Sequence, residues 1–183
     1  MNCSLKIAVM MLGFVAALSA GSPSVAHEVP LPKGQVLLAH LPGDWRWALM
    51  DIGQPGMPPS WAFFPGNRGR GKLVLSMDRG QYDEAALREK VRQDGLLLLV
   101  RAKEKSLLLE RLAEGGLRAF AYTLTDPNPG PGAFPKLWQG MVRLEGGMVF
   151  RFTLFFFEES ESWVDEAQTM IRVLSLKGAG RKN

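Results

Sequence analysis

A single stretch decides the fold: Lys136-Leu-Trp-Gln-Gly-Met-Val-Arg-Leu144, Glu145-Gly146-Gly147, Met148-Val-Phe-Arg-Phe-Thr-Leu-Phe-Phe-Phe157. Two runs of β-branched, aromatic and long apolar residues flank a double glycine, which predicts a β-hairpin. A two-residue loop at Gly146-Gly147 would mix arginine with aromatic rings on each face. A three-residue loop that adds Glu145 shifts the register by one residue and gathers four pairs on one apolar face: Leu144–Met148, Val142–Phe150, Gly140–Phe152 and Trp138–Leu154.

We therefore predict a type I turn closed by a left-handed residue in a bulge, with Gly147 supplying the positive φ. The other face of the second strand then carries Phe155 and Phe157. Either a second helix covers these two rings, or they form an exposed patch that binds a partner.

The N-terminus predicts export. Lys6 precedes an apolar run from Ile7 to Ala20, and the small residues Ser24-Val25-Ala26 suit cleavage before His27. The run is shorter than the roughly 20 apolar residues that a membrane-spanning helix needs. We expect residues 1–26 to be a signal peptide, with cleavage after Ala20 as the alternative, and no membrane span in the mature chain.

Composition agrees with a periplasmic or secreted protein. The chain has 183 residues, 46% of them hydrophobic, which suits one domain. Cleavage after Ala26 removes the only cysteine, Cys3, so the mature protein has no disulfide. It also removes Lys6, so the basic residues fall from 22 to 21 against 18 acidic ones, a net charge of +3. This excess is too small to indicate nucleic acid; it favours solubility or association with an anionic surface.

Along the mature chain, proline-dotted residues 27–43 predict an extended arm before a single domain at 44–177. Alternating apolar residues predict strands, and turn residues predict connectors between them. The strands are Trp45–Ile52, Trp61–Phe64, Lys72–Asp78 and Leu117–Thr125; the connectors are Pro65–Gly71 and Asp126–Gly132.

Two helices are predicted. Asp83 caps one from about Glu84 to Gln93, which Asp94-Gly95 ends. The clearest helix runs from about Ser162 to Leu174, before a basic tail at 178–183. Leucine runs between 96 and 116 fit two strands, 96–100 and 106–109, or one helix; we favour strands because the sheet would otherwise be short. The sequence thus predicts an α+β fold with two main helices on an antiparallel sheet.

The order of these elements, the aromatic hairpin around Gly146-Gly147 and the closing helix from Trp163 to Leu174 resemble the Mog1/PsbP-like fold, including exported bacterial DcrB-like proteins. The resemblance spans about residues 45–176. It implies a compact, mostly non-enzymatic domain that works through protein or envelope interactions, and it assigns no functional residue.

Catalytic and metal-binding patterns fail in their context. Gly66 to Lys72 has P-loop spacing, but Leu73 replaces the hydroxyl residue and a strand follows. The two histidines, His27 and His40, lie in the arm. After cleavage they could bind copper together with the new N-terminal amine, but we expect two solvated side chains instead. We expect no enzyme activity, no cofactor and no metal.

Binding is the remaining function. Our leading hypothesis is that the domain binds a protein or another envelope component through a basic loop and an aromatic surface. The alternative is a carrier of a small apolar ligand or lipid, held in a cleft between sheet and final helix lined by Trp138, Phe152 and Met170. The candidate binding residues are Arg68, Arg70, Lys72, Asn128, Phe134, Phe155 and Phe157.

Overall fold

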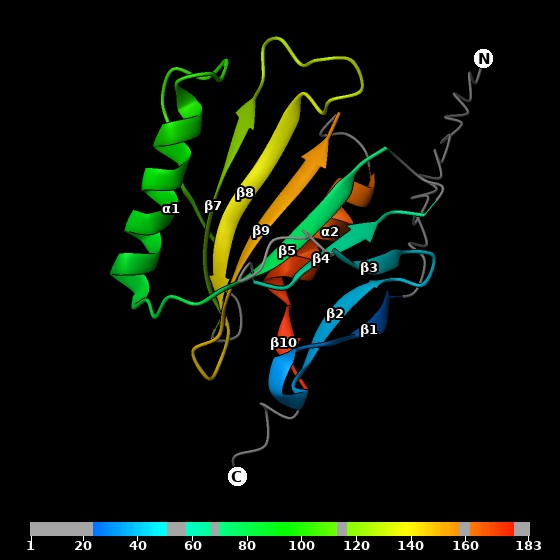
Figure 1. The fold of residues 1–183 in the computed structure, drawn as a ribbon. Coiled ribbons are helices and arrows are strands. Elements are labelled where there is room, and N and C mark those ends of the chain that lie inside the picture. Colours follow the sequence, from blue (N-terminus) through cyan, green and yellow to red (C-terminus); the bar gives the residue numbers. More distant parts are fainter. Residues whose placement is uncertain (1–23, 51–57, 67–69, 113–116, 158–161, 178–183) are drawn as a thin grey trace, which may run out of the picture.

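The structure, a computed structural model, describes residues 24–50, 58–66, 70–112, 117–157 and 162–177. Its centre is a seven-stranded antiparallel sheet in the order β3-β4-β5-β9-β8-β7-β6 (Figure 1). The predicted α+β class with two helices on an antiparallel sheet is confirmed. The strands are β3 (Arg46–Met50), β4 (Ser60–Phe64), β5 (Lys72–Asp78), β6 (Glu110–Leu112), β7 (Arg118–Thr125), β8 (Lys136–Arg143) and β9 (Val149–Phe156).

The aromatic hairpin, β8 with β9, has the predicted register. Trp138 faces Leu154, Gly140 faces Phe152 and Val142 faces Phe150. The Leu144 N–H donates to the Met148 carbonyl at 2.9 Å, so the loop has three residues. The predicted turn type is wrong: the Gly147 N–H donates to Leu144, and Gly146 has φ of 84°, which suits a type II turn. Gly147, with φ of 85°, supplies the predicted left-handed residue.

The helix α2 (Ser162–Arg172) covers the inner face of the sheet, as the sequence predicted. Its apolar side chains pack with the inner side chains of β8 and β9 in one core cluster. Trp138 and Phe152 stack with ring centroids 4.6 Å apart. The indole N–H of Trp45 reaches the Glu166 carboxylate on α2 at 3.1 Å. The fully buried residues of α2 are Trp163, Ala167, Met170 and Ile171.

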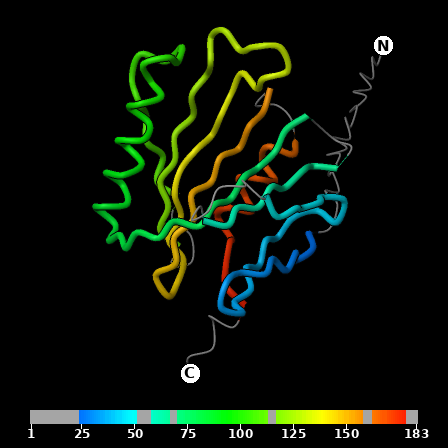
Figure 2. Tube along the Cα trace, in the orientation of Figure 1, coloured from blue at the N-terminus to red at the C-terminus, as the bar shows by residue number. Residues whose placement is uncertain are grey.

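A second sheet forms from the two ends of the described chain. Its order is β1 (Ser24–Pro30), β2 (Val36–Pro42), β10 (Ser175–Leu176). A short 3-10 turn at Pro32–Gly34 joins β1 to β2. The blue hairpin therefore lies beside the red C-terminal segment (Figure 2). The prediction of an arm at 27–43 is wrong, because alternate residues of β2 are buried in the core of the domain. These residues are Leu37, Ala39 and Leu41.

The helix α1 (Glu84–Leu99) packs on the outer face, against β7 and β8. Asp83 caps it as predicted, accepting a hydrogen bond from the Ala86 N–H at 2.8 Å. The predicted end at Asp94-Gly95 and the predicted strand at 96–100 are wrong, because the helix continues to Leu99. Gly95 serves close packing: a Cβ there would meet Leu107 at 2.7 Å and Tyr122 at 3.0 Å.

Smaller differences concern strand positions. The second leucine segment, predicted as a strand at 106–109, forms one at Glu110–Leu112 instead. In the first predicted strand Trp45 is buried and Trp47 packs against the core, but the Leu49 side chain is 62% exposed. Residues 1–23 of the signal segment, residues 67–69 of the connector and the basic tail at 178–183 lie outside the described residues.

None of the helices in the described part of the chain is long and apolar enough to cross a membrane.

The closest packing in the aromatic hairpin occurs at Gly140. A Cβ there would overlap the Phe120 carbonyl oxygen and the Phe152 ring. Overpacking of this kind costs roughly 1–3 kcal/mol, and a backbone oxygen cannot rotate away, so we expect Gly140→Ala to lower the free energy of unfolding by about 3 kcal/mol. Urea denaturation measures the change. Gly130→Ala is the control, because its Cβ would have no neighbour within 4 Å; equal effects of the two changes would refute the packing argument.

Candidate functional site

Three phenylalanine rings form an aromatic cluster on the outer face of the sheet. The Phe134 ring lies 6.0 Å from that of Phe155 and 5.2 Å from that of Phe157, centroid to centroid. The Lys72 ammonium lies 5.4 Å from the Phe155 centroid, in cation–π range. All three phenylalanines are half-buried. We call Phe134, Phe155 and Phe157 the aromatic cluster.

The register of the sheet explains why the cluster forms. Lys72, Phe155, Leu137 and Leu124 pair in turn across β5, β9, β8 and β7, so they form one row on the outer face. The helix α1 packs over the β7 and β8 end of this row. At the Phe155 end of the row, the covering group is the ring of Phe134, which belongs to the connector after β7. Neither sequence expectation for Phe155 and Phe157 was therefore right: the rings are partly covered.

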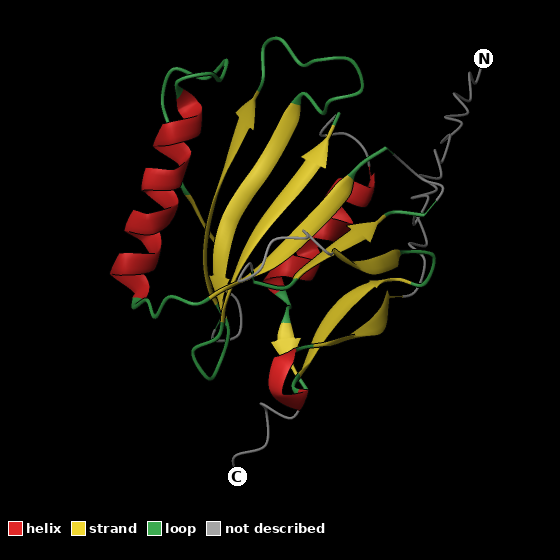
Figure 3. Cartoon of the chain, viewed as in Figure 1, coloured by secondary structure: helices red, strands yellow, loops and turns green. Residues whose placement is uncertain are grey.

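An apolar pocket of about 290 Å³ lies beside the cluster. It opens between the C-terminal end of α1 and the connector from β7 to β8, which lie at the same end of the molecule (Figure 3). Its charged lining residues are Arg101, Asp126 and Lys136. Its apolar lining residues are Leu98, Ala102, Leu124, Phe134, Pro135, Leu137 and Phe155.

Hydrogen bonds hold both rims of this pocket. The Asp126 N–H donates to the Pro135 carbonyl at 2.7 Å, which closes the connector at its base. On the other side, the Lys103 N–H donates to the Thr125 carbonyl at 2.8 Å, and the Thr125 N–H donates to the Glu104 carboxylate at 2.9 Å. The pocket is therefore formed without a ligand, as binding pockets usually are.

The Glu104 carboxylate titrates abnormally because of these bonds. Its partial burial acts to raise the pKa, but the hydrogen bonds from Thr125 outweigh burial, and the pKa of Glu104 lies below its usual value of 4.5. The carboxylate is therefore charged at neutral pH, where it holds the segment after α1 against the end of β7.

The structure brings four predicted site residues together: Lys72, Phe134, Phe155 and Phe157. Asn128 lies exposed in the connector, where its N–H donates to the Asp126 carboxylate at 2.9 Å. Arg70 is exposed just before β5, and Arg68 lies outside the described residues. Sequence analysis missed Leu98, which the end of α1 brings to the pocket, because residues 96–100 were assigned to a strand.

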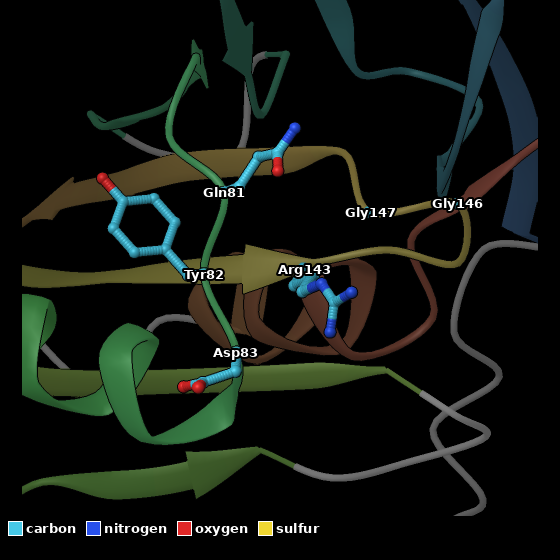
Figure 4. Close-up of a pocket in the computed structure, with 6 residues that line it drawn as sticks. All are labelled: Gln81, Tyr82, Asp83, Arg143, Gly146 and Gly147. Carbon is cyan, nitrogen blue, oxygen red and sulfur yellow. The ribbon is translucent and has the colours of Figure 1, made fainter.

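A second pocket, of about 450 Å³, lies at the opposite end of α1, near the hairpin turn (Figure 4). Two of its polar side chains have structural roles: Asp83 caps α1, and the Tyr82 hydroxyl donates to Asp78 at 3.1 Å. Figure 4 shows the side chains of Tyr82, Asp83 and Arg143 pointing in different directions. Because they do not converge, this pocket offers no arrangement for catalysis.

A polar group under α1 fixes the helix to the sheet. Arg151 on β9 contacts the carboxylates of Asp94 at 2.9 Å and Asp78 at 3.9 Å, and Lys90 also bonds Asp94. The Tyr122 hydroxyl donates to Gln139 at 2.8 Å. Burial, and then the Asp94 charge, raise the pKa of Tyr122, so this hydroxyl stays protonated as a donor.

The positions of the two histidines and of Lys72 bear on the copper and P-loop readings of the sequence. His27 pairs with Ala39 and His40 pairs with Ala26, so the two histidines point to opposite faces of the β1–β2 hairpin. They cannot share one copper ion, as the conceivable copper site required. Lys72 begins β5 instead of a helix, which agrees with the rejection of the P-loop. Among the described residues no three His, Cys, Asp or Glu side chains gather as metal ligands.

The cleft predicted between sheet and final helix is filled. Trp138 is 1% exposed, and Phe152 and Met170 are 0% exposed, all within one core cluster. The predicted position of an apolar ligand is therefore wrong, because α2 packs directly on these side chains.

No protein-family model and no curated protein matches the chain. Among solved structures, the chain is similar to the Ran-binding protein Mog1p of Saccharomyces cerevisiae, with a TM-score of 0.42 and 12% sequence identity. The match covers 82% of this chain and 95% of that chain.

Glu104 provides a pH test of the pocket rim. Because its folded-state pKa is lowered, the stability from its charge is present above pH 4.5 and is lost as the pH falls through the folded-state pKa. We expect Glu104→Gln to cost about 1 kcal/mol or less at pH 7, since the group is partly solvated. Urea denaturation at several pH values measures the difference, which should shrink below pH 4.5. A difference that is the same at every pH would contradict the assignment.

Proposed function

We propose that the protein is an exported, non-catalytic binding domain whose apolar pocket takes a side chain from a protein of the cell envelope. The observation that supports this most is the aromatic cluster beside the pocket. The three predicted rings come from two segments, the connector after β7 and the end of β9, and Phe134 and Phe155 line an open, apolar depression, which suits the anchor residue of a partner. Binding of such an anchor residue requires no catalytic side chain.

The charged residues around the pocket indicate which kind of partner segment would bind there. Lys72 lies over the Phe155 ring, and Arg101 is one of the residues that line the pocket. Arg70 is exposed two residues before Lys72 and extends the basic border. A segment with one apolar side chain flanked by carboxylates would complement this arrangement, because opposite charges at an interface rim steer association.

The compartment rests on the N-terminal sequence, and we propose the periplasm or the exterior. The structure is compatible with removal of the signal: cleavage after Ala26 takes only the exposed residues Ser24–Ala26 from β1, and the buried Val29 remains. We expect N-terminal sequencing of the exported protein to begin at His27 or at Gly21. A full-length chain retained in the cytoplasm would contradict export.

Site-specific photocrosslinking tests the pocket. A benzophenone amino acid at position 98, on the pocket rim, should form an adduct with an envelope protein in intact cells. Phe134→Ser should reduce this adduct about tenfold, because loss of one anchor contact of roughly 1.4 kcal/mol has that effect. The same amino acid at exposed position 49 is the matched control. Equal adducts from both positions, or an adduct indifferent to Phe134→Ser, would remove the pocket from the proposal.

A small apolar ligand is the second candidate, and the pocket volume favours it. About 290 Å³ lies just below the range of small-molecule pockets, roughly 300–1,000 Å³, so a ligand of few atoms would fill it. Native mass spectrometry of the exported protein distinguishes the two candidates. A bound small molecule that Phe134→Ser releases supports the carrier; a protein adduct at position 98 supports the leading proposal.

A further inference from the structure

An exposed aliphatic patch lies at the C-terminal end of α1, next to the pocket. The side chain of Leu97 is 77% exposed, that of Val100 is 86% exposed and that of Leu108 is 82% exposed. Leu96 and Leu98 are also exposed. We call Leu97, Val100 and Leu108 the aliphatic tip. Several large apolar side chains exposed at one end of a helix and in the segment that returns beside it indicate a contact surface.

The fold brings the members of the tip together. Leu107 lies over Gly95, so the chain after α1 turns back along the last turns of the helix and carries Leu108 with it. The N–H groups of Arg101 and Ala102 bond the last helical carbonyls at 3.1 Å each. Bonds from residues 103 and 104 to Thr125 then fix the segment to the end of β7. The tip is therefore a formed surface rather than a loose loop.

Three cations lie between Val100 and Leu108 in the sequence. Arg101, Lys103 and Lys105 are all exposed, and none forms a salt bridge with another described residue. The one carboxylate among them, Glu104, turns inward to the Thr125 N–H. The end of α1 and the segment after it therefore present exposed aliphatic side chains and three exposed cations, while the one acid between residues 97 and 108 turns inward.

We propose that the aliphatic tip docks on an anionic lipid bilayer, with Leu97, Val100 and Leu108 entering the interface and the three cations contacting headgroups. Apolar groups beside Lys and Arg are the composition of interfacial membrane contacts. Protein interfaces instead favour aromatic residues and deplete lysine. This inference goes beyond the proposed function, because it uses residues outside the aromatic cluster. Docking of the aliphatic tip would bring the pocket close to the membrane surface, where an envelope protein could bind it.

A fluorescent label tests the contact. The chain has one native cysteine, Cys3. The exported protein is prepared with Cys3→Ser and Val100→Cys, and the new thiol carries an environment-sensitive nitrobenzoxadiazole dye. We expect a blue shift with vesicles of phosphatidylglycerol and phosphatidylcholine, and little change with phosphatidylcholine alone. The dye at Leu49→Cys, an exposed leucine away from the tip, should not respond.

Charge and apolar variants separate the two parts of the contact. Lys103→Glu with Lys105→Glu should weaken vesicle binding at least about tenfold, because each cation near an anionic surface contributes roughly 1 kcal/mol, and added salt should weaken it too. Arg79→Glu, an exposed arginine before α1, is the charge control. Leu97→Ser should weaken binding about tenfold, whereas Leu49→Ser should not.

Three outcomes would overturn the lipid assignment. These are absence of vesicle binding by the folded protein, a dye response at position 49 equal to that at position 100, and equal losses from Arg79→Glu and the paired lysine variant. A benzophenone at position 97 that labels a protein and no lipid would assign the tip to a protein partner instead. The crosslink at position 98 and its loss in Phe134→Ser would still stand in that case, so the two proposals fail separately.

Discussion

The structure depends on the pairing of β8 with β9. Side chains alternate between the faces of a strand, so this register sends Trp138, Phe152 and Leu154 towards α2 and leaves Phe155 on the outer face. A shift of one residue would place arginine in the core and expose the rings that fill it. Gly140 permits the close approach, since a side chain there would overlap the neighbouring strand. The same register thus determines both the closed core and the open outer site.

Much of this arrangement could be predicted because its causes are local. Alternation in Lys72–Asp78 and Leu117–Thr125 identified two strands within one residue of their ends. The double glycine fixed the loop length, and the hydrophobic spacing in Ser162–Leu174 gave α2. Three rings of the outer site followed from the register and from the connector next to it.

The errors come from contacts that no local pattern shows. Asp94-Gly95 resembles a helix end, yet it lies inside α1. The residue is glycine there because Leu107 and Tyr122 occupy the space that a side chain would need. The β1–β2 hairpin was missed although Leu37, Ala39 and Leu41 alternate; its prolines suggested an arm, and its third strand lies near the other end of the chain. Once residues 96–100 were assigned to a strand, the pocket rim formed by the end of α1 could not be predicted.

The pairing of β10 with β2 also constrains the order of folding. Leu176 joins Leu37, and α2 packs on β2, so the N-terminal hairpin lacks its neighbours until the last helix has been synthesised. Contacts across such a long separation form slowly. Under the export proposed above, a chain that crosses a membrane unfolded would gain time from this delay, since β1 and β2 lack β10 and α2 until the final segment arrives.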